Sequence, residues 1–233
     1  MTRFHVFSGY RTFFREFQRQ YHTTGALCPS GRALSKALTR FVRDGKNGAQ
    51  GPRRILEVGP GSGPVTDMIV PHLNPDDRLD LVEINASFVE FLHQRLKREP
   101  LWRAASGRIH IFHRPVEEMV DQPPYDLIVS GLPLNNFSAA DVERILGVLT
   151  VLLKPGGRLS FFEYIAIRTM KRFVAPKADR QRLQEIEQLL TATFRKGEVA
   201  RNAIWLNVPP AWVHHVDLHR DGGALHDGSH AMQ

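Results

Sequence analysis

The sequence has little of what an exported or membrane-spanning protein needs. Its 233 residues include one cysteine, Cys28, so no disulfide can form within the chain. No apolar run reaches the roughly 18 residues of a spanning helix. The segment from Met1 to His5 lacks the continuous apolar stretch of a secretion signal. We therefore expect a cytoplasmic protein without a transmembrane segment.

Positive charge is in excess. The formal net charge is +7 and the sequence pI is about 9.9, which favours a polyanionic partner. Nucleic acid and an anionic membrane surface both fit, and many basic soluble proteins bind neither. Charge alone does not choose among these three interpretations.

The chain divides at a segment rich in turn-forming residues, 43–52. We expect an N-terminal helical segment, residues 1–45, followed by the main domain, residues 46–233. Apolar and amphipathic segments alternate in that domain. We predict strands at 54–58, 79–84, 109–112, 125–129 and 158–164, and helices at 64–71, 86–97, 139–153 and 180–194.

This alternation predicts parallel βαβ units in a doubly wound α/β sheet. Two further predicted strands, 199–208 and 213–218, have no helix between them. We expect them to pair antiparallel at one edge, so that the sheet has seven mostly parallel strands in a Rossmann-like arrangement.

A glycine-rich loop follows the first predicted strand. The strand ends at Glu57, alternate glycines follow, and Pro64 is suited to a first helical turn. A dinucleotide-binding loop would need glycine at position 64 or 66, where this chain has Pro64 and Thr66. A phosphate-binding P-loop would need a Lys-Ser or Lys-Thr pair, which the loop lacks. Both nucleotide-binding interpretations are therefore excluded.

Acidic residues end two successive strands of the predicted sheet. A cationic amino-acid group can lie against Glu57, and Glu83, at the end of the second strand, can accept hydrogen bonds from both hydroxyls of a ribose. This pattern resembles the class I methyltransferases over residues 53–164. The resemblance implies S-adenosylmethionine as cofactor. It implies a site formed by Glu57, Gly59, Gly61, Gly63, Glu83, Ile84, Val116, Ser130, Gly131 and Leu132.

One position departs from that family. After the third strand the family often has an Asp for the adenine amino group, whereas this chain reads His-Arg-Pro-Val-Glu at 113–117. Adenine recognition is therefore expected to use the backbone near Val116.

The acceptor loop after the fourth strand reads Ser-Gly-Leu-Pro-Leu at 130–134. The ribosomal RNA adenine dimethylases carry Asn-Leu-Pro followed by an aromatic residue here. In this chain Gly131 replaces the Asn and Leu134 replaces the ring, so the stacking platform for a base is missing. An RNA adenine N6-methyltransferase remains the second candidate.

Three segments resemble the bacterial phospholipid N-methyltransferases. They are Thr-Gly-Ala-Leu-Cys-Pro-Ser at 24–30, the acceptor loop, and Trp-Leu-Asn-Val-Pro-Pro-Ala at 205–211. This resemblance implies N-methylation of a lipid amine, with phosphatidylethanolamine as first substrate and an ornithine lipid as an open alternative. It adds Thr24 and Ser30 to the cofactor site. A binding protein on an inactive methyltransferase fold is disfavoured by Glu57 and Glu83.

The N-terminal segment is basic and aromatic. Aromatic residues recur at helical spacing from Phe4 to Tyr21, and arginines recur from Arg3 to Arg19. Such a helix can lie in an anionic lipid surface, or it can pack on its own domain. We expect a monomer that associates peripherally with the inner face of the cell membrane.

Methylation of an amine requires a group that holds the ammonium and takes its proton. The candidate catalytic residues are Tyr21, Asn135, Glu163 and Tyr164. The candidates for holding the lipid are Pro133, Arg168 and Arg172. His214, His215 and His219 lack Cys or carboxylate partners at metal-ligand spacing, so we predict surface or edge histidines there and no metal.

Overall fold

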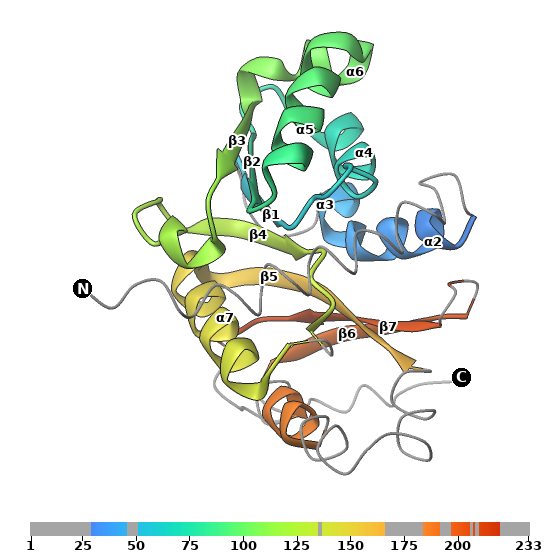
Figure 1. Ribbon diagram of the computed structural model, residues 1–233, viewed down its shortest axis with the longest axis vertical. Coiled ribbons are helices and arrows are strands. Elements are labelled where there is room, and N and C mark those ends of the chain that lie inside the picture. Colours follow the sequence, from blue (N-terminus) through green and yellow to red (C-terminus); the bar gives the residue numbers. More distant parts are fainter. Residues whose placement is uncertain are drawn as a thin grey trace, which may run out of the picture.

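The computed structural model describes residues 29–45, 51–134, 137–165, 184–191, 197–205, 207 and 210–219 (Figure 1). Seven strands form one sheet in the order β3-β2-β1-β4-β5-β7-β6. The strands are β1 (Arg54–Val58), β2 (Arg78–Glu83), β3 (Ile109–His113), β4 (Tyr125–Ser130), β5 (Leu153–Tyr164), β6 (Glu198–Ile204) and β7 (Ala211–Val216).

The first five strands are parallel, and β7 runs antiparallel to both β5 and β6. The helices are α2 (Pro29–Leu38), α3 (Arg40–Asp44), α4 (Thr66–Ile69), α5 (Ala86–Arg98), α6 (Pro100–Ala104) and α7 (Ala139–Leu152), and residues 184–191 are also helical. Short 3-10 turns are η1 (Val70–His72), η2 (Ser106–Arg108) and η3 (Val116–Met119). The predicted Rossmann-like sheet with an antiparallel edge is confirmed.

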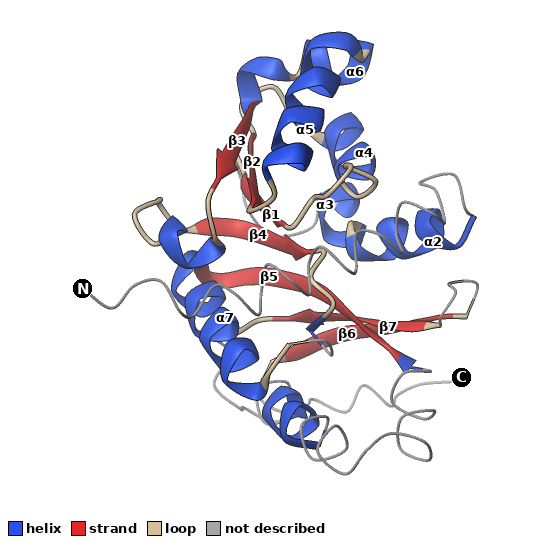
Figure 2. Ribbon diagram, in the orientation of Figure 1, coloured by secondary structure: helices blue, strands red, loops and turns tan. Residues whose placement is uncertain are grey.

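Helices cover both faces of the sheet (Figure 2). Neighbouring strand residues point to opposite faces, so Ile55 and Leu56 on β1 belong to different apolar clusters. Side chains of α2 to α6 pack with Ile55 on one face. Side chains of α7 and of residues 184–191 pack with Leu56 on the other. The carboxyl ends of β1, β2, β4 and β5 are thereby held between two helical layers.

The structure corrects several predicted boundaries. The helix expected at 64–71 is short, because α4 ends at Ile69 and a 3-10 turn contains Pro71. The fifth strand begins at Leu153 directly after α7, since Leu153 already pairs with Tyr125 before the register shifts. Helix α6 was not predicted from the sequence. Strand β6 is shorter than predicted, and β7 begins and ends two residues earlier than predicted, although their antiparallel pairing is confirmed.

Candidate cofactor and acceptor site

The glycine loop turns at the carboxyl end of β1. Gly59, Gly61 and Gly63 have φ values of 70°, 57° and 90°, a region that residues with a β-carbon rarely adopt. The loop is tied to the sheet because Gly59 N–H donates to the Val82 carbonyl at 3.0 Å. Glycine at alternate positions is therefore a requirement of this backbone path.

Glu57 is a buried acid beneath this loop. Its side chain is 1% exposed, and its Oε2 accepts a 2.7 Å hydrogen bond from the Thr66 hydroxyl at the start of α4. Among the described residues, Oε1 is buried and has no hydrogen-bond partner. Burial raises the pKa of Glu57 to about 8, and nearby Asp67 and Glu83 add to the rise while the Thr66 bond opposes it.

Glu83 connects the second strand to the same loop. Its Oε2 accepts from Gly61 N–H at 3.1 Å, and its Oε1 accepts from Asn85 N–H at 2.9 Å. Burial raises the pKa of Glu83 to about 7, while these backbone hydrogen bonds oppose the rise. A carboxylate has about four acceptor positions, so both oxygens can still accept from a ligand.

These two acids fit the predicted cofactor. Within the described residues, no cationic side chain forms an ion pair with Glu57 or Glu83, although both are buried. A ligand with an ammonium group would supply the donor that Glu57 Oε1 lacks, and ribose hydroxyls would donate to Glu83. The pair therefore suits a ligand that carries both a cationic amino group and a ribose.

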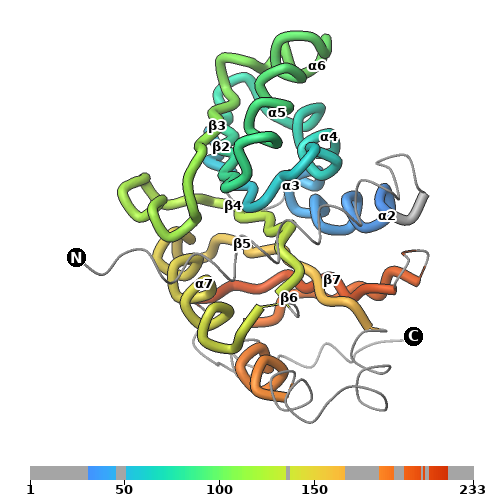
Figure 3. The backbone as a smooth tube through the Cα atoms, in the orientation of Figure 1, coloured from blue at the N-terminus to red at the C-terminus, as the bar shows by residue number. Residues whose placement is uncertain are grey.

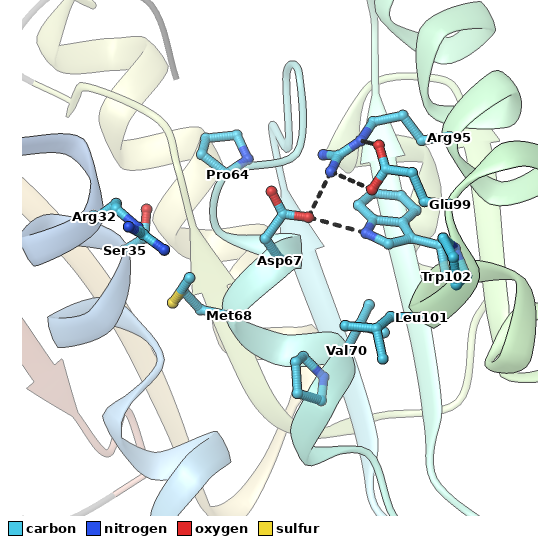
Figure 4. Close-up of a pocket in the computed structure, with 12 residues that line it drawn as sticks. Arg32, Ser35, Pro64, Asp67, Met68, Val70, Arg95, Glu99, Leu101 and Trp102 are labelled. Atoms are coloured by element: carbon cyan, nitrogen blue, oxygen red, sulfur yellow. Dashed lines mark hydrogen bonds and ion pairs between the residues drawn. The ribbon is translucent and has the colours of Figure 1, made fainter. Parts of the chain in front are cut away.

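A hydrogen-bonded network supports the loop from behind (Figure 4). Arg95 on α5 donates from Nη1 to the Ser62 carbonyl at 2.8 Å and from Nη2 to Asp67 at 2.6 Å. It also forms a two-point ion pair with Glu99 and lies 4.3 Å from the centre of the Trp102 ring. Arg95 thus fixes the loop at Ser62 and the start of α4 together.

A cavity of about 490 Å³ lies on the outer side of this network. It is lined by residues of α2, α4 and α6, among them Ser35, Met68 and Leu101. Neither Glu57 nor Glu83 lines it. The candidate cofactor site is therefore at the strand ends, where the buried acids and the glycine loop meet, and is distinct from this cavity.

The acceptor loop packs directly on the cofactor loop. Gly131 N–H donates to the Val58 carbonyl at 2.8 Å, and a β-carbon on Gly131 would come 2.7 Å from the Gly59 carbonyl oxygen. Leu132 N–H lies 3.3 Å from the hydroxyl of the fully buried Ser130. The two loops therefore form one unit. Leu132, Pro133 and Leu134 are buried beside it.

The end of β5 presents its two candidate catalytic residues to opposite faces. Tyr164 is 7% exposed and packs edge-on to Phe162, on the face of α2 to α6. Glu163 lies on the other face, together with Phe161 and the acceptor-loop residue Leu132. Of these two residues, only Glu163 lies on the same face of the sheet as Leu132 and Leu134.

The remaining predicted cofactor residues lie at neighbouring strand ends. Ile84 follows β2 directly and is half-buried against the apolar cluster under α7, and Val116 is buried in η3 after β3. His113 Nε2 lies 3.3 Å from the Ile84 carbonyl oxygen and links these two loops. Ser30 is in α2. Tyr21, Thr24, Asn135, Arg168 and Arg172 lie outside the described residues.

The prediction of surface or edge histidines was wrong for two of three positions. His214 and His215 are 3% and 0% exposed, because β7 lies inside the sheet between β5 and β6. His215 Nδ1 is 2.7 Å from the Ser160 hydroxyl, and His214 lies between two glutamates. His219 follows β7, with its Nε2 2.7 Å from the Leu153 carbonyl oxygen.

Comparison with known proteins agrees with this fold. Residues 56–159 match the family described as "Methyltransferase domain". An O-methyltransferase from Bacillus cereus, solved in complex with S-adenosylhomocysteine, superposes with a TM-score of 0.58 and 15% identity, covering 90% of each chain. The chain thus has the Rossmann-like methyltransferase fold, and its cofactor is S-adenosylmethionine.

Two curated relatives of the methyltransferase domain differ in acceptor. An ornithine lipid N-methyltransferase from Singulisphaera acidiphila is 24% identical over 165 residues, which are 69% of this chain and 82% of that protein. A tRNA1(Val) (adenine(37)-N6)-methyltransferase from Dyadobacter fermentans is 27% identical over 122 residues, covering 46% and 49%. In the part of the chain that the structure describes, no helix is long and apolar enough to cross a bilayer.

Sequence reasoning missed the residues that support the methyltransferase domain's site from a distance. Arg95 lies 33 residues from Ser62, and His214 lies 51 residues from Glu163. No local motif marks either pair. The contact of Thr66 with Glu57 could have been predicted from the sequence, because a hydroxyl in the first turn after the glycine loop is close to the acid at the strand end.

Proposed function

We propose that this methyltransferase N-methylates the primary amine of a membrane lipid head group. The observation that carries the proposal is Glu163, a carboxylate at the carboxyl end of β5 on the same face as Leu132 and Leu134. A carboxylate recognises an ammonium group through charge-assisted hydrogen bonds. The exocyclic amine of adenine is neutral, so it could donate a hydrogen bond to Glu163 but would not form an ion pair with it.

The acceptor loop supports the same choice. An Asn at position 131, as in the adenine dimethylases, would place its β-carbon against the Gly59 carbonyl oxygen. Leu134, at the position of their aromatic ring, is 1% exposed and belongs to the core. The relative that methylates tRNA adenine keeps a nucleic acid acceptor as the second candidate. The ornithine lipid relative, which covers more of both chains, favours a lipid amine.

The described surface is suited to an anionic lipid surface. Arg32, Lys36 and Arg40 are exposed at four-residue spacing along α2 and α3. Trp205, after β6, is 68% exposed, and tryptophan favours the interface between head groups and acyl chains. Phosphatidylethanolamine, indicated by the sequence resemblance, and ornithine lipid, indicated by the named relative, are the two candidate head groups.

The chemistry requires positioning and proton removal. When bound, S-adenosylmethionine supplies a methyl group on a positively charged sulfur. The loops at 57–63 and 130–134 hold the two reactants in line, which supplies most of the acceleration once the amine nitrogen is about 3 Å from the methyl carbon. Glu163 holds the ammonium and accepts its proton, so that the nitrogen lone pair becomes available.

The test is product analysis. Purified protein is incubated with S-adenosylmethionine and vesicles of phosphatidylethanolamine or of ornithine lipid, and the lipids are analysed by mass spectrometry. We expect mono-, di- or trimethylated amine in one or both vesicle types. Unchanged lipid in both would contradict the proposal.

A further inference from the structure

Three side chains on adjacent strands form a continuous chain across the sheet edge. Glu163 on β5 has its Oε1 3.3 Å from His214 Nε2 on β7, and His214 Nδ1 is 2.9 Å from Glu198 Oε1 on β6. The three strands are neighbours in the order β5-β7-β6 (Figure 3). Each ring nitrogen of His214 therefore faces a different carboxylate.

Exposure along this chain is lowest at the central His214 and highest at Glu198. The side chains of Glu163 and His214 are 14% and 4% exposed, whereas that of Glu198 is 34% exposed. The His214 ring stacks on Phe161, with centroids 5.1 Å apart and planes 10° apart, which fixes its orientation. The chain thus leads from the candidate acceptor site, past a buried and oriented imidazole, to solvent at the outer strand.

A lipid amine methyltransferase has a specific need for such a chain. The unperturbed pKa of an alkylamine is about 10, so the substrate arrives protonated. Each transfer forms one carbon–nitrogen bond as the electron pair of the carbon–sulfur bond returns to sulfur. One proton per methyl must leave the amine before the nitrogen can react. Repeated methylation at a site covered by a lipid surface therefore needs a route for protons.

We propose that Glu163, His214 and Glu198 form a proton-transfer path from the substrate amine to solvent, an inference that rests on the proposed function. The ammonium gives its proton to Glu163, and Glu163 passes it to His214 Nε2. His214 releases the proton on its Nδ1 to Glu198, which gives it to water. Exchange of the ring proton with water restores the Nδ1–H tautomer before the next methyl transfer. An imidazole suits the middle position because it can accept at one nitrogen while it donates from the other.

The charged groups around His214 are compatible with this role. Glu163 and Glu198 face its two nitrogens, and Arg201, its register partner on β6, lies with its guanidinium over the Trp212 ring at 4.3 Å. His215, the next residue on β7, bonds to Ser160 on the opposite face. A buried imidazole needs a partner at each nitrogen, and for His214 both partners are carboxylates, which can give or take a proton.

The test compares two amines in the full-length protein. His214→Gln keeps an N–H donor for a glutamate partner but cannot carry a proton from one glutamate to the other. One substrate is the lipid with its ordinary amine. The other is an aminooxy analogue of the same lipid, whose amine is already neutral near neutral pH. We expect His214→Gln to lower kcat for the ordinary lipid roughly 10–100-fold and to leave kcat for the analogue within about twofold. Glu198→Gln is expected to change the ratio in the same direction.

His215→Gln is the matched control, since it removes the neighbouring buried histidine of β7 from the opposite face. It is expected to leave the ratio of the two rates unchanged. An equal loss on both amines in His214→Gln, or no loss on either, would overturn the proton path while the proposed function stands. A wild-type protein that methylates neither lipid would overturn the proposed function and this inference with it.

Discussion

Gly131 lies so close to Gly59 that a β-carbon added to it would come 2.7 Å from the Gly59 carbonyl oxygen. This contact joins the candidate acceptor loop to the candidate cofactor loop. The carbonyl belongs to the backbone of a residue whose N–H is bonded to the Val82 carbonyl of β2. Relief of a clash at this point must therefore displace one of the two loops.

We predict that Gly131→Ala weakens S-adenosylmethionine binding roughly 5–100-fold, in line with about 1–3 kcal/mol for overpacking. Isothermal titration calorimetry measures the change. Gly147→Ala in α7 is the matched control, because a β-carbon there meets nothing within 4 Å. It is expected to bind normally and to stabilise the helix by about 1 kcal/mol or less. Equal affinity of Gly131→Ala and wild type would refute the contact.

Glu57 is expected to show opposite effects on binding and on stability. If Glu57 binds the ammonium group of S-adenosylmethionine, Glu57→Gln removes the charge that faces it, and the dissociation constant should rise roughly 10–100-fold. Without ligand, the folded-state pKa of about 8 lies above the ordinary value of 4.5. The unfolded chain therefore loses this proton first, and the free energy of unfolding falls as pH rises from 4.5 to 8.

A glutamine side chain does not titrate, so the Glu57→Gln variant should lack this part of the pH dependence. Between pH 5 and pH 8 we expect the free energy of unfolding of the variant to rise by about 2 kcal/mol or more relative to that of wild type. Urea unfolding at several pH values measures it. Glu90→Gln, at an exposed position of α5, should follow the wild-type curve. A constant difference between Glu57→Gln and wild type across this range would show that Glu57 is not buried as described.

Arg95 is predicted to act through geometry as well as charge. Arg95→Lys keeps the positive charge but cannot reach Ser62, Asp67 and Glu99 together. We expect a loss of about 1–3 kcal/mol in the free energy of unfolding and a higher KM for S-adenosylmethionine. The KM for the lipid should not change. Arg98→Lys, on the exposed end of α5, should change neither the free energy of unfolding nor the KM for S-adenosylmethionine. If Arg95→Lys also changed neither quantity, Arg95 would not support the glycine loop.

His215 is predicted to make the protein sensitive to acid. Burial, with smaller effects of Arg40 and His214, lowers the pKa of His215 from 6.5 to about 4. The unfolded chain therefore binds a proton that the folded chain excludes, and stability is lost as pH falls from 6.5 towards 4. The loss is expected to reach about 3 kcal/mol in wild type. This loss of stability at acid pH should be absent in His215→Gln. It should remain in the control variant His93→Gln, because His93 is exposed. If His215→Gln lost as much stability as wild type, the acid sensitivity would not come from His215.

Local pattern was enough for the strands and the cofactor loop. Strand β1 has the predicted bounds, because an apolar run followed by alternate glycines admits few other backbone paths. The end of α4 was not predictable in this way, since the 3-10 turn at Pro71 depends on packing against α6. The start of β5 was misjudged because Gly156 and Gly157 suggested a turn before the strand. They lie instead in a register shift within it, since Leu153 already pairs with Tyr125 and pairing resumes at Arg158.

The acceptor side depended on contacts between distant segments. The alternation of β5 separates Glu163 from Tyr164, although they are neighbours in sequence and both were predicted to be catalytic. The link from Glu163 to His214 depends on the register of two antiparallel strands, Phe161 opposite His214. A shift by one residue would turn His214 to the other face, and no local sequence feature determines that register.

The central claim is tested most directly by the destination of the methyl group. Purified protein receives methyl-labelled S-adenosylmethionine together with ribosomal RNA and vesicles that contain phosphatidylethanolamine and ornithine lipid, and the label is measured after solvent extraction. We predict label in the lipid fraction, on the head-group amine. Label in the RNA with none in the lipid, or in neither fraction, would contradict a lipid amine methyltransferase.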